Sequence, residues 1–436
     1  MYLTGRLALL VGLGVVPVVL LNAAGADAWL LALTWVAVCA VAATVDVAAA
    51  ADPRLLRVAR ELPQRTRLGE QAVVRLRLVN TGRRRLRGLA RDAWQPTAGA
   101  PSERIAIDVP PGESRAYRIG LLPRRRGELR TKFAAVRSAG PLGLAGRQAT
   151  IDAPSAIRVL PPFRSRRHLA SRVARLRELD GNTSVQVRGQ GTEFDSLREY
   201  VRGDDVRSID WRATARSGTT MLRTWRPERD RHVVIVVDTG RTAAARVGDG
   251  TRLEAAFEAA LLLSALAQRA GDHVHLVAFD RVVRARVTGV EGPALVPALV
   301  DALAPVDAQL IDTDWDAALA QARRLARHPS LLVLLTAQES VDASRGFLGV
   351  LPAAARPGTA VLVGTATDTG LADAAVLRGS SDDLYRAAAA EAALASTARV
   401  TRAIERAGAD AISDTPEDLP PRIADRYLAL KRAGRL

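Results

Sequence analysis

Two apolar runs open the chain, at about residues 7–24 and 28–45. Each is about 18 residues long, close to the length that a helix needs to cross a bilayer core of about 30 Å. Arg6 precedes the pair, Arg54 follows it, and the turn between the runs has no lysine or arginine. Because basic residues favour the cytoplasmic side, the pattern predicts a transmembrane hairpin over residues 1–50 with both ends in the cytoplasm. A cleaved signal peptide is the alternative, but the immediate second run argues against it.

Apolar and polar residues alternate through much of residues 51–160. The alternation occurs at residues 74–79, 105–109 and 117–121, and turns containing proline or glycine follow these runs. A period of two with turns every 8–12 residues is typical of a small β-sandwich. No catalytic grouping occurs in this segment, so we expect a spacer or an interaction module.

The pattern of apolar and polar residues changes at residue 232. Residues 232–238 form a continuous, mostly β-branched run, as expected of a strand buried on both faces of a parallel sheet. Apolar runs and helical patterns then alternate to the end of the chain, which predicts a doubly wound α/β sheet with ligands at the carboxyl ends of its strands. The expected strands are 232–238, 273–279, 282–287, 331–336, 359–364 and 409–413, and the expected helices are 253–269, 314–328, 383–407 and 421–432.

These patterns divide the chain into four parts. The expected parts are a transmembrane hairpin (1–50), a basic β-sandwich (51–160), a linker with a charged strap (161–231) and an α/β domain (232–436). Together they predict an α/β doubly wound sheet preceded by a small β-sandwich and an N-terminal two-helix hairpin.

Charge is spread unevenly over the 436 residues. The formal net charge is +16, yet residues 51–160 carry 23 basic against 9 acidic residues, while residues 232–436 carry 22 against 25. The basic segment begins just after the second apolar run, where anionic lipid headgroups attract each well-placed basic residue by about 1 kcal/mol. Few aromatic residues interleave with the arginines, so a nucleic-acid binder is the least favoured function. The excess of arginine over lysine, 60 to 2, is typical of a high-GC bacterial genome.

Several enzyme classes lack their motifs in this sequence. Cys39 is the single cysteine, which excludes a disulfide framework and a cysteine-based zinc site. The chain has no phosphate loop, no H-E-x-x-H motif and no G-x-S-x-G elbow. His273 and His275 have the spacing of two metal ligands on one strand face, but no third ligand is evident, so ordinary strand histidines are expected. The sequence therefore supports no enzyme class.

The end of the first α/β strand is the one place that suggests ligand chemistry. Its sequence, DTGRT from Asp238, resembles the metal-ion-dependent adhesion site of the von Willebrand factor type A domain, written D-x-S-x-S. The resemblance implies that Asp238, Thr242 and Thr313 match ligand positions. Gly240 replaces the first serine, and Ala337 stands where the family carries a later aspartate.

These departures bear on metal binding. Mg²⁺ needs near-octahedral oxygen ligation, and this chain lacks one hydroxyl and one carboxylate of the set. We expect no tightly bound cofactor. A weak Mg²⁺ site is the alternative, with Asp312 or Asp314 compensating, and a Mg²⁺-dependent hydrolase at the Asp238 loop is the function that such a site would allow. Without a metal, Asp238 is a strand-end carboxylate that accepts backbone N–H bonds.

A charged strap precedes the sheet. Residues 191–216 read GTEFDSLREYVRGDDVRSIDWRATAR, with acids and arginines interleaved around apolar anchors such as Trp211. We expect a loop-rich segment that packs on the α/β domain through Arg–carboxylate pairs. The pairs form either an internal network or a docking surface. The candidate partner-binding residues are Arg198, Arg202, Asp204, Asp205, Arg207, Asp210 and Arg212.

The strap also carries a family resemblance. It is similar to the hallmark of the bacterial family named domain of unknown function 58, G-x-E-F-x-x-x-R-x-Y-x-x-G-D-x-x-R-x-I-x-W-x-x-x-A-R, and the R-x-x-x-x-E-R tail follows from Arg223. The resemblance implies association with a MoxR-type AAA+ ATPase in a chaperone-like or assembly role. The chain is therefore expected to be an interaction or scaffold protein of the bacterial cell membrane, with most of its mass in the cytoplasm.

Overall fold

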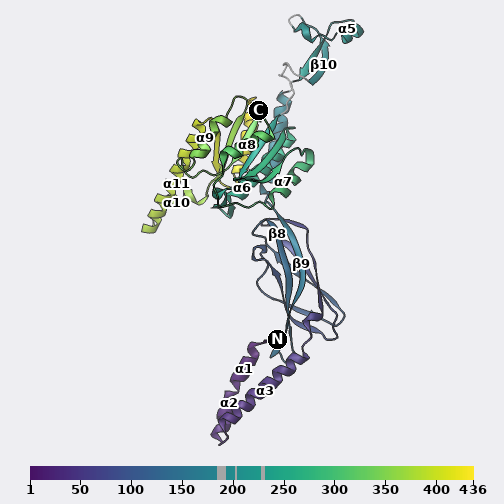
Figure 1. Cartoon of the computed structure of the whole chain (residues 1–436), viewed down its shortest axis with the longest axis vertical. Coiled ribbons are helices and arrows are strands. Elements are labelled where there is room, and N and C mark those ends of the chain that lie inside the picture. Colours follow the sequence, from purple (N-terminus) through teal and green to yellow (C-terminus); the bar gives the residue numbers. More distant parts are fainter. Residues whose placement is uncertain (184–192, 202–203, 227–230) are drawn as a thin grey trace. The chain divides into compact units, whose positions relative to one another are not determined.

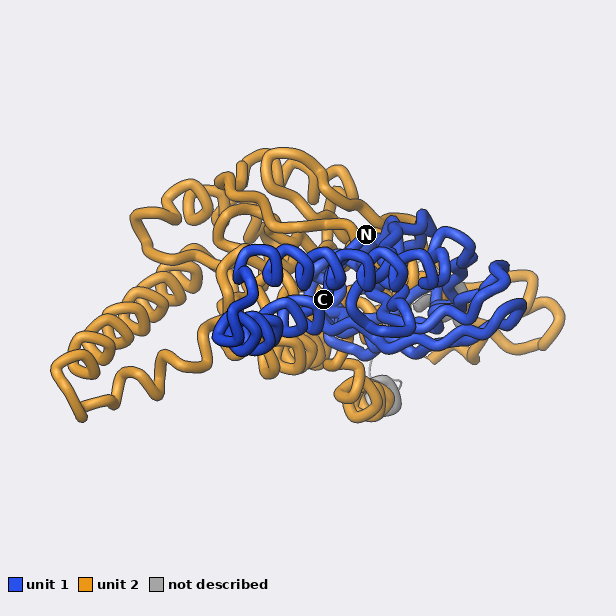
Figure 2. Tube along the Cα trace, turned by 90° about the horizontal axis from the view of Figure 1, so that it is seen from below, with its two compact units in different colours: residues 1–160 blue, residues 161–436 orange. Residues whose placement is uncertain are grey.

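The chain consists of two compact units. The computed structural model describes residues 1–183, 193–201, 204–226 and 231–436. One unit spans Met1–Leu160 and the other spans Pro161–Leu436 (Figure 2). The first contains the apolar helices and the β-sandwich, and the second contains the strap and the α/β domain (Figure 1).

The apolar runs at the start of the chain form helices. They are preceded by β1 (Tyr2–Leu3) and comprise α1 (Gly5–Leu13), α2 (Val15–Ala23) and α3 (Ala28–Ala49). The stretches Gly5–Ala23 and Ala28–Leu55 are long and apolar enough to cross a membrane, and most of their side chains are exposed. The predicted pair of spans is thus present as two apolar helical stretches.

Trp35 of α3 joins the two stretches. Its Nε1 donates a hydrogen bond to the Leu10 carbonyl at 3.2 Å. The indole lies so close to Gly14 that a β-carbon there would collide with it. Small residues that permit close approach are typical of helix pairs in membranes.

The C-terminal end of α3 is tied to the turn between β8 (Gly127–Ala139) and β9 (Ala145–Leu160). The Asp46 carboxylate, which is fully buried, accepts hydrogen bonds from three backbone N–H groups of this turn. The bonds come from Leu142 at 2.7 Å, Leu144 at 2.8 Å and Ala145 at 2.9 Å. Any side chain at Gly140 would collide with Asp46. Arg147 of β9 also donates to the Val47 carbonyl of α3 at 2.9 Å, so the buried carboxylate is one of several contacts that fix the second apolar helix to the sandwich.

Two sheets with a shared core form the β-sandwich, as the alternation predicts. One sheet has the order β1-β9-β8-β5-β6, with β3 also paired to β9, and the other has the order β2-β4-β7. The alternating residues Val74, Leu76 and Leu78 are completely buried and pack into this core. The remaining elements are η1 (Pro53–Leu55), β2 (Leu56–Glu61), β3 (Arg65–Arg67), β4 (Ala72–Asn80), β5 (Leu86–Trp94), η2 (Pro96–Ala98), β6 (Ile105–Val109) and β7 (Ser114–Leu121).

The α/β domain is a six-stranded sheet with the order β16-β15-β12-β17-β18-β19. All pairings are parallel except that of β15 with β16. The chain extends the sheet to one side of β12 and then to the other, so the ends of β12 and β17 lie where the direction of winding reverses. The strands are β12 (His232–Asp238), β15 (His273–Phe279), β16 (Val283–Val287), β17 (Leu331–Leu335), β18 (Ala360–Ala366) and β19 (Asp410–Asp414).

Helices cover both faces of this sheet. On one face α8 (Trp315–Leu325), α9 (Arg345–Ala354) and α11 (Ser381–Arg406) share a core with the strands. On the other face α6 (Arg252–Arg269) packs on β12 and β18, and α12 (Leu419–Arg432) packs on α6 and β19. The domain also contains η5 (Arg241–Ala244), β13 (Arg246–Val247), β14 (Gly250–Thr251), η6 (Gly292–Ala294), α7 (Leu295–Leu303) and α10 (Gly370–Ala375), and η3 (Arg164–His168) and α4 (Leu169–Thr183) begin the unit.

The strap is more regular than the sequence suggests. Strand β10 (Glu193–Glu199) pairs antiparallel with β11 (Met221–Arg226), and η4 (Val206–Ser208) and α5 (Trp211–Ser217) lie between them in sequence. The expectation of a loop-rich segment is therefore wrong. The interleaved charges conceal the strands because they break the apolar alternation that identifies a hairpin.

Candidate functional site

Asp238 ends the central strand β12 and lies at the edge of the sheet where the carboxyl ends of β12, β15 and β17 meet. Its side chain is 3% exposed. Strand β12 is parallel to both neighbours, with Asp238 opposite Phe279 and Val237 opposite Leu335. The loops after β12 and β17, and the loop that precedes α8, therefore lie around the Asp238 carboxylate.

Donors from three loops bind this carboxylate. Oδ1 accepts hydrogen bonds from the Gly240 N–H at 2.8 Å and from the Thr313 hydroxyl at 2.5 Å. Oδ2 accepts one from the Thr336 hydroxyl at 2.6 Å, and Thr242 lies at 3.5 Å from the same oxygen. The structure thus brings together the three residues singled out from the sequence and adds Thr336.

Thr336 is a site residue that the sequence motif does not identify. It directly follows β17, the strand that pairs with β12, so its place beside Asp238 results from the parallel register. Had the strand order been known, that register would have identified Thr336 as a partner. The adjacent Ala337 is buried and provides no carboxylate.

Gly240 has a steric reason to be glycine here. A β-carbon at this position would collide with the Thr313 hydroxyl and lie 3.0 Å from Asp238 Oδ1. The serine that the adhesion-site pattern requires therefore cannot be accommodated unless Thr313 moves away. The short hydrogen bond from Thr313 to Asp238 requires glycine at position 240. A metal-ligating serine at that position and this hydrogen bond therefore exclude each other.

The space beside the carboxylate is small. A hollow of about 10 Å³ lies next to Asp238, Thr336 and Arg252, which is room for about one water. Burial lowers the pKa of the Arg252 guanidinium, with Glu339 and Asp368 opposing this shift. The hollow does not have the volume of a substrate site.

Two buried carboxylates at this edge have opposite electrostatics. Burial raises the pKa of Asp238, and its hydrogen bonds from Thr313, Thr336 and Gly240 only partly oppose the shift. Burial acts in the same direction on Asp280, but the Arg284 guanidinium at 2.6 Å and backbone N–H donors hold the pKa of that carboxyl below its usual range. Asp280 is thus compensated by a cation, while hydroxyl and N–H groups stabilise Asp238.

The donor set does not fit a tightly held Mg²⁺. Asp312 is exposed and forms an ion pair with Arg241 at 3.3 Å, and Asp314 caps α8 by accepting the Ala317 N–H at 3.0 Å. Neither replaces the missing carboxylate. Within residues 1–183, 193–201, 204–226 and 231–436, no group of three His, Cys, Asp or Glu side chains is placed to hold a metal ion.

The strand histidines bind other protein side chains. His232 Nδ1 and His275 Nε2 are 3.0 Å apart, and the other His275 nitrogen lies 2.7 Å from the Thr288 hydroxyl. His273 lies 2.9 Å from Glu291. These contacts are those of ordinary strand histidines.

Asp204 and Asp205 of the strap contact other residues of the strap. Asp204 forms an ion pair with Arg198 at 2.6 Å and accepts the Val201 N–H at 2.9 Å. Asp205 accepts the Arg207 N–H at 3.0 Å, which begins η4. These carboxylates therefore support the turn between β10 and α5.

Asp210 has a similar local role at the next element. It caps α5 through the N–H groups of Arg212 and Ala213 and forms an ion pair with Arg223 at 2.5 Å. The Arg223 hydrogen bond, together with the backbone bonds, holds the pKa of Asp210 below its usual range. Of the sequence candidates, Arg202 lies outside the described residues.

Basic and apolar side chains remain available on the same segment. In the part of the chain that is described, the side chains of Arg207 and Arg212 form no ion pair. Trp211 is 70% exposed and Val206 is 62% exposed. We call the residues Val206, Arg207, Trp211 and Arg212 the Trp211 surface.

Solved structures with a weak likeness to this chain include three bacterial proteins. A FixG-related protein from Vibrio parahaemolyticus shares 10% identity over 24% of this chain and 96% of its own, with a TM-score of 0.19. A β-glucosidase from Listeria innocua shares 13% identity over 24% of this chain, which spans only 16% of that enzyme, at a TM-score of 0.17. A GH20 exo-β-N-acetylglucosaminidase from Vibrio harveyi shares 11% identity over 82% and 75% of the two chains, at a TM-score of 0.23. None of these scores is high enough to define the fold.

Sequence comparison is more specific. No curated protein matches the chain. The profile of a family described as "Protein of unknown function DUF58" matches residues 196–348, which run from the first strand of the strap to α9. The apolar helices and the β-sandwich lie outside the match. The resemblance of the strap and of the first half of the α/β domain to the DUF58 family is thereby supported.

Proposed function

We propose that this protein is a membrane-anchored, cytoplasm-facing interaction protein whose strap binds a protein partner. The partner that the family resemblance implies is a MoxR-type AAA+ ATPase, with the pair acting in a chaperone-like or assembly role. The observation that carries the proposal is the Trp211 surface, where an exposed indole lies in sequence next to arginines without acidic partners in the described part of the chain.

The composition of this surface suits a protein interface. Tryptophan and arginine are enriched among the residues that contribute most of the binding energy at protein interfaces. The Asp210 cap and the Arg223 ion pair fix α5, so Trp211 is held in place before binding. The complementary partner surface has an apolar pocket bordered by carboxylates.

The apolar helices support the anchoring part of the proposal. An 18-residue window within each of Gly5–Ala23 and Ala28–Leu55 has a mean hydropathy of 2.1. The arginine-rich sandwich follows them directly, which by the positive-inside tendency supports a cytoplasmic location for the sandwich and for the second unit. This orientation puts the strap where a cytoplasmic ATPase can reach it.

The α/β domain, in this proposal, is a von Willebrand factor A-like domain whose metal site has degenerated. Support comes from the convergence of Asp238, Thr242 and Thr313 at the strand ends and from the doubly wound sheet. The bonds from Gly240, Thr313 and Thr336 make the site a structural junction. Its role is then to hold three loops together.

Affinity capture of the full chain from native bacterial membranes, with and without nucleotide, tests the proposal. We expect a AAA+ ATPase to be captured, and Trp211→Ala to lower its recovery about tenfold or more, as for an interface hot spot. Tyr385→Ala is the matched control, because Tyr385 is a similarly exposed aromatic residue on α11. Absence of an ATPase from the wild-type eluate, or equal recovery with Trp211→Ala, would refute the proposal.

A Mg²⁺-dependent hydrolase at the Asp238 loop is the second candidate. The observation that favours it is the same convergence of a carboxylate and hydroxyls at the strand ends. It requires Mg²⁺ or Mn²⁺ to displace the Thr313 and Thr336 hydroxyl protons from Asp238. Titration of either metal into the full chain tests this candidate, because a Mg²⁺-dependent hydrolase requires metal binding and the absence of binding would refute it.

A further inference from the structure

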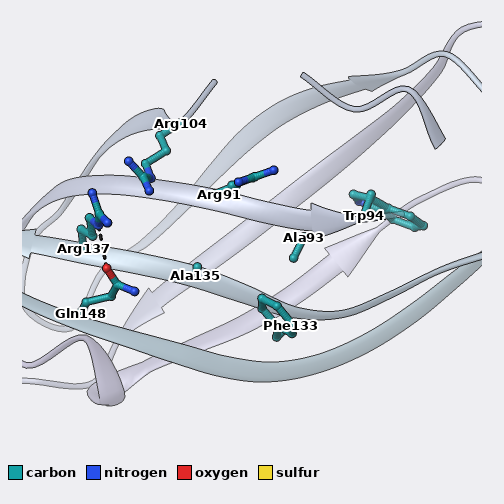
Figure 3. A pocket seen from close by; sticks show the side chains of 8 residues that line it. All are labelled: Arg91, Ala93, Trp94, Arg104, Phe133, Ala135, Arg137 and Gln148. Carbon is teal, nitrogen blue, oxygen red and sulfur yellow. Dashed lines mark hydrogen bonds between the residues drawn. The ribbon is translucent and has the colours of Figure 1, made fainter. Parts of the chain in front are cut away.

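The β-sandwich carries a hollow on the outer face of the larger sheet. Its volume is about 290 Å³, and it is lined by residues of β5, β8 and β9 and of the loop before β6. Ala93 and Ala135 form its floor, with larger side chains around them (Figure 3). We call it the arginine groove, and its other lining residues are Arg91, Trp94, Arg104, Phe133, Arg137 and Gln148.

The register of the strands explains why the sheet is hollow here. Phe133, Ala135 and Arg137 alternate along β8 and therefore point to the same face. Arg91 of β5 lies opposite Ala135, and Gln148 of β9 lies opposite Arg137. The methyl group of Ala135 leaves space that the larger neighbours surround.

Three guanidinium groups surround this space without acidic partners. In the described part of the chain, Arg91, Arg104 and Arg137 form no ion pair. The Nε of Arg137 donates to the neutral Gln148 side chain at 2.7 Å. Other arginines of the same sandwich do have an acidic partner, as Arg85 does with Asp108 at 2.6 Å.

Three guanidinium groups that lack acidic partners around one hollow favour the binding of an anion. Guanidinium groups bind phosphate oxygens with two parallel N–H donors, and three of them suit a phosphate ester better than a carboxylate. Phe133 and Trp94 lie at the other end of the groove, away from Arg137 (Figure 3). The groove thus joins a phosphate-binding end to an apolar end, which matches an amphipathic ligand.

The position of the groove within its unit identifies the source of such a ligand. The Arg137–Gln148 pair lies two residues from the Ala139–Gly146 pair, or about 7 Å along the strand. Gly146 pairs with Tyr2, which lies just before the first apolar helix, and the Arg137 guanidinium lies 5.0 Å from the Tyr2 ring centroid. The phosphate-binding end is therefore next to the start of the helices.

We propose that the arginine groove binds the phosphate headgroup of an anionic phospholipid of the phosphatidylglycerol type. This inference rests on the membrane anchoring in the proposed function, and it adds a specific lipid site to it. Basic pockets beside membrane helices are a known means of lipid recognition. The lipid would stabilise the sandwich on the membrane surface through Arg91, Arg104 and Arg137.

Native mass spectrometry of the full chain in an uncharged detergent tests the site. The probes are phosphatidylglycerol, phosphatidylcholine and inorganic phosphate, each added in a separate titration. We expect phosphatidylglycerol to bind at least about tenfold more tightly than phosphatidylcholine, because only the anionic lipid has a net charge to pair with the arginines. Equal binding of the two lipids, or phosphate binding as tight as that of phosphatidylglycerol, would overturn the assignment to an anionic lipid.

Two variants separate the groove from general charge. The triple change Arg91→Gln, Arg104→Gln, Arg137→Gln is expected to weaken phosphatidylglycerol binding at least about tenfold. The control makes the same charge change on the other sheet, with Arg57→Gln, Arg75→Gln and Arg118→Gln, and is expected to stay within about twofold of the wild type. Equal losses in the two triple variants would show that net charge, and not the groove, binds the lipid.

A third variant keeps every charge. Ala135→Leu fills the groove from its floor, and we expect it to abolish the preference for phosphatidylglycerol while the far-ultraviolet circular dichroism stays unchanged. Retained preference would overturn the proposal even if the triple variant failed to fold. Capture of the ATPase is measured on the same variants. If Ala135→Leu loses the lipid preference and still captures the ATPase, the lipid site is supported and the proposed partner is unaffected. If Ala135→Leu keeps the lipid preference, only the lipid site is refuted.

Discussion

Asp46 and Asp238 are buried carboxylates in different units, and both hold loops together. Asp46 lies in the last turn of the apolar helix α3 and accepts hydrogen bonds from three backbone N–H groups of one turn. Asp238 ends a strand and accepts one backbone N–H and two hydroxyl groups from three loops. In both cases protein donors occupy the two carboxylate oxygens.

The kind of donor distinguishes the two sites. Backbone N–H groups are fixed by the path of the chain, so the Asp46 site has one arrangement. Hydroxyl groups rotate and can accept as well as donate, so Thr313 and Thr336 could turn their lone pairs toward a cation. The donors around a buried carboxylate, and not its burial alone, therefore decide whether it can also bind a metal.

The largest expected effect is that of Asp46→Ala. Removing the carboxylate leaves three N–H groups of the β8–β9 turn without acceptors, at a cost of about 3 kcal/mol or more. We expect amide hydrogen exchange at Leu142, Leu144 and Ala145 to accelerate at least about 100-fold, measured by mass spectrometry on the full chain. Asp108→Ala, which removes an exposed ion pair, is the control and should leave these amides unchanged. Unaltered exchange in Asp46→Ala would show that the carboxylate does not hold the turn.

The next effect concerns the pH dependence of Asp238→Asn. Because burial raises the pKa of Asp238, the folded protein binds this proton more tightly than the unfolded chain. The stability contribution of the carboxyl is therefore fully present below the unfolded value of about 3.9 and is lost as the pH rises through the folded pKa. We therefore expect the free energy of unfolding of the wild type, relative to that of Asp238→Asn, to decrease as the pH rises from the unfolded pKa through the folded pKa of Asp238.

Thermal unfolding of the two proteins across a pH series measures this difference. Asparagine does not titrate, so any change in the gap between the two midpoints reports Asp238. A gap that widens in favour of the wild type as the pH rises would mean that the hydrogen bonds outweigh burial and that the pKa is lowered instead.

A smaller effect separates the hydroxyl groups around Asp238. Thr336→Val removes a 2.6 Å hydrogen bond to a buried carboxylate and should destabilise the domain by about 1.5–3 kcal/mol. Thr242→Val has the same change of shape, but its hydroxyl is 3.5 Å from the carboxylate, so the expected cost is below about 0.5 kcal/mol. Chemical denaturation, followed through the unfolding transition of the α/β domain, measures both costs. Equal costs would mean that Thr242 is as strong a donor as Thr336.

Much of the fold could be predicted from the sequence because its signal is local. The strand 232–238 and the strand 273–279 have the predicted bounds, because short, mainly apolar runs of this length identify buried strands. Helices α7 and α9 are absent from the elements that the sequence predicts. Both are short, and α9 contains Pro352 and two glycines, which weaken the helical pattern.

The sites were less predictable because they depend on contacts between distant residues. Asp238, Thr242 and Thr313 could be selected from a motif, and the structure brings them together. Thr336 is 98 residues away from Asp238, and its role depends on the order of the strands. The arginine groove depends on the register of β5, β8 and β9, which alternation alone does not set.

Asp46 shows the same limit more strongly. In the sequence it is one acidic residue at the end of an apolar run, and the turn that it binds lies 96–99 residues further along the chain. Nothing local marks such a contact. It becomes visible only when the sandwich places the β8–β9 turn beside the end of α3.

We infer above all that protein donors satisfy Asp238 without a metal, so that this carboxylate acts as a structural junction between loops. Calorimetric titration of Mg²⁺ and Mn²⁺ into the full chain, repeated with Asp238→Ala, tests this claim most directly. We expect no binding heat in either protein at millimolar metal. Binding by the wild type that disappears in Asp238→Ala would contradict it and establish a metal site at the end of β12.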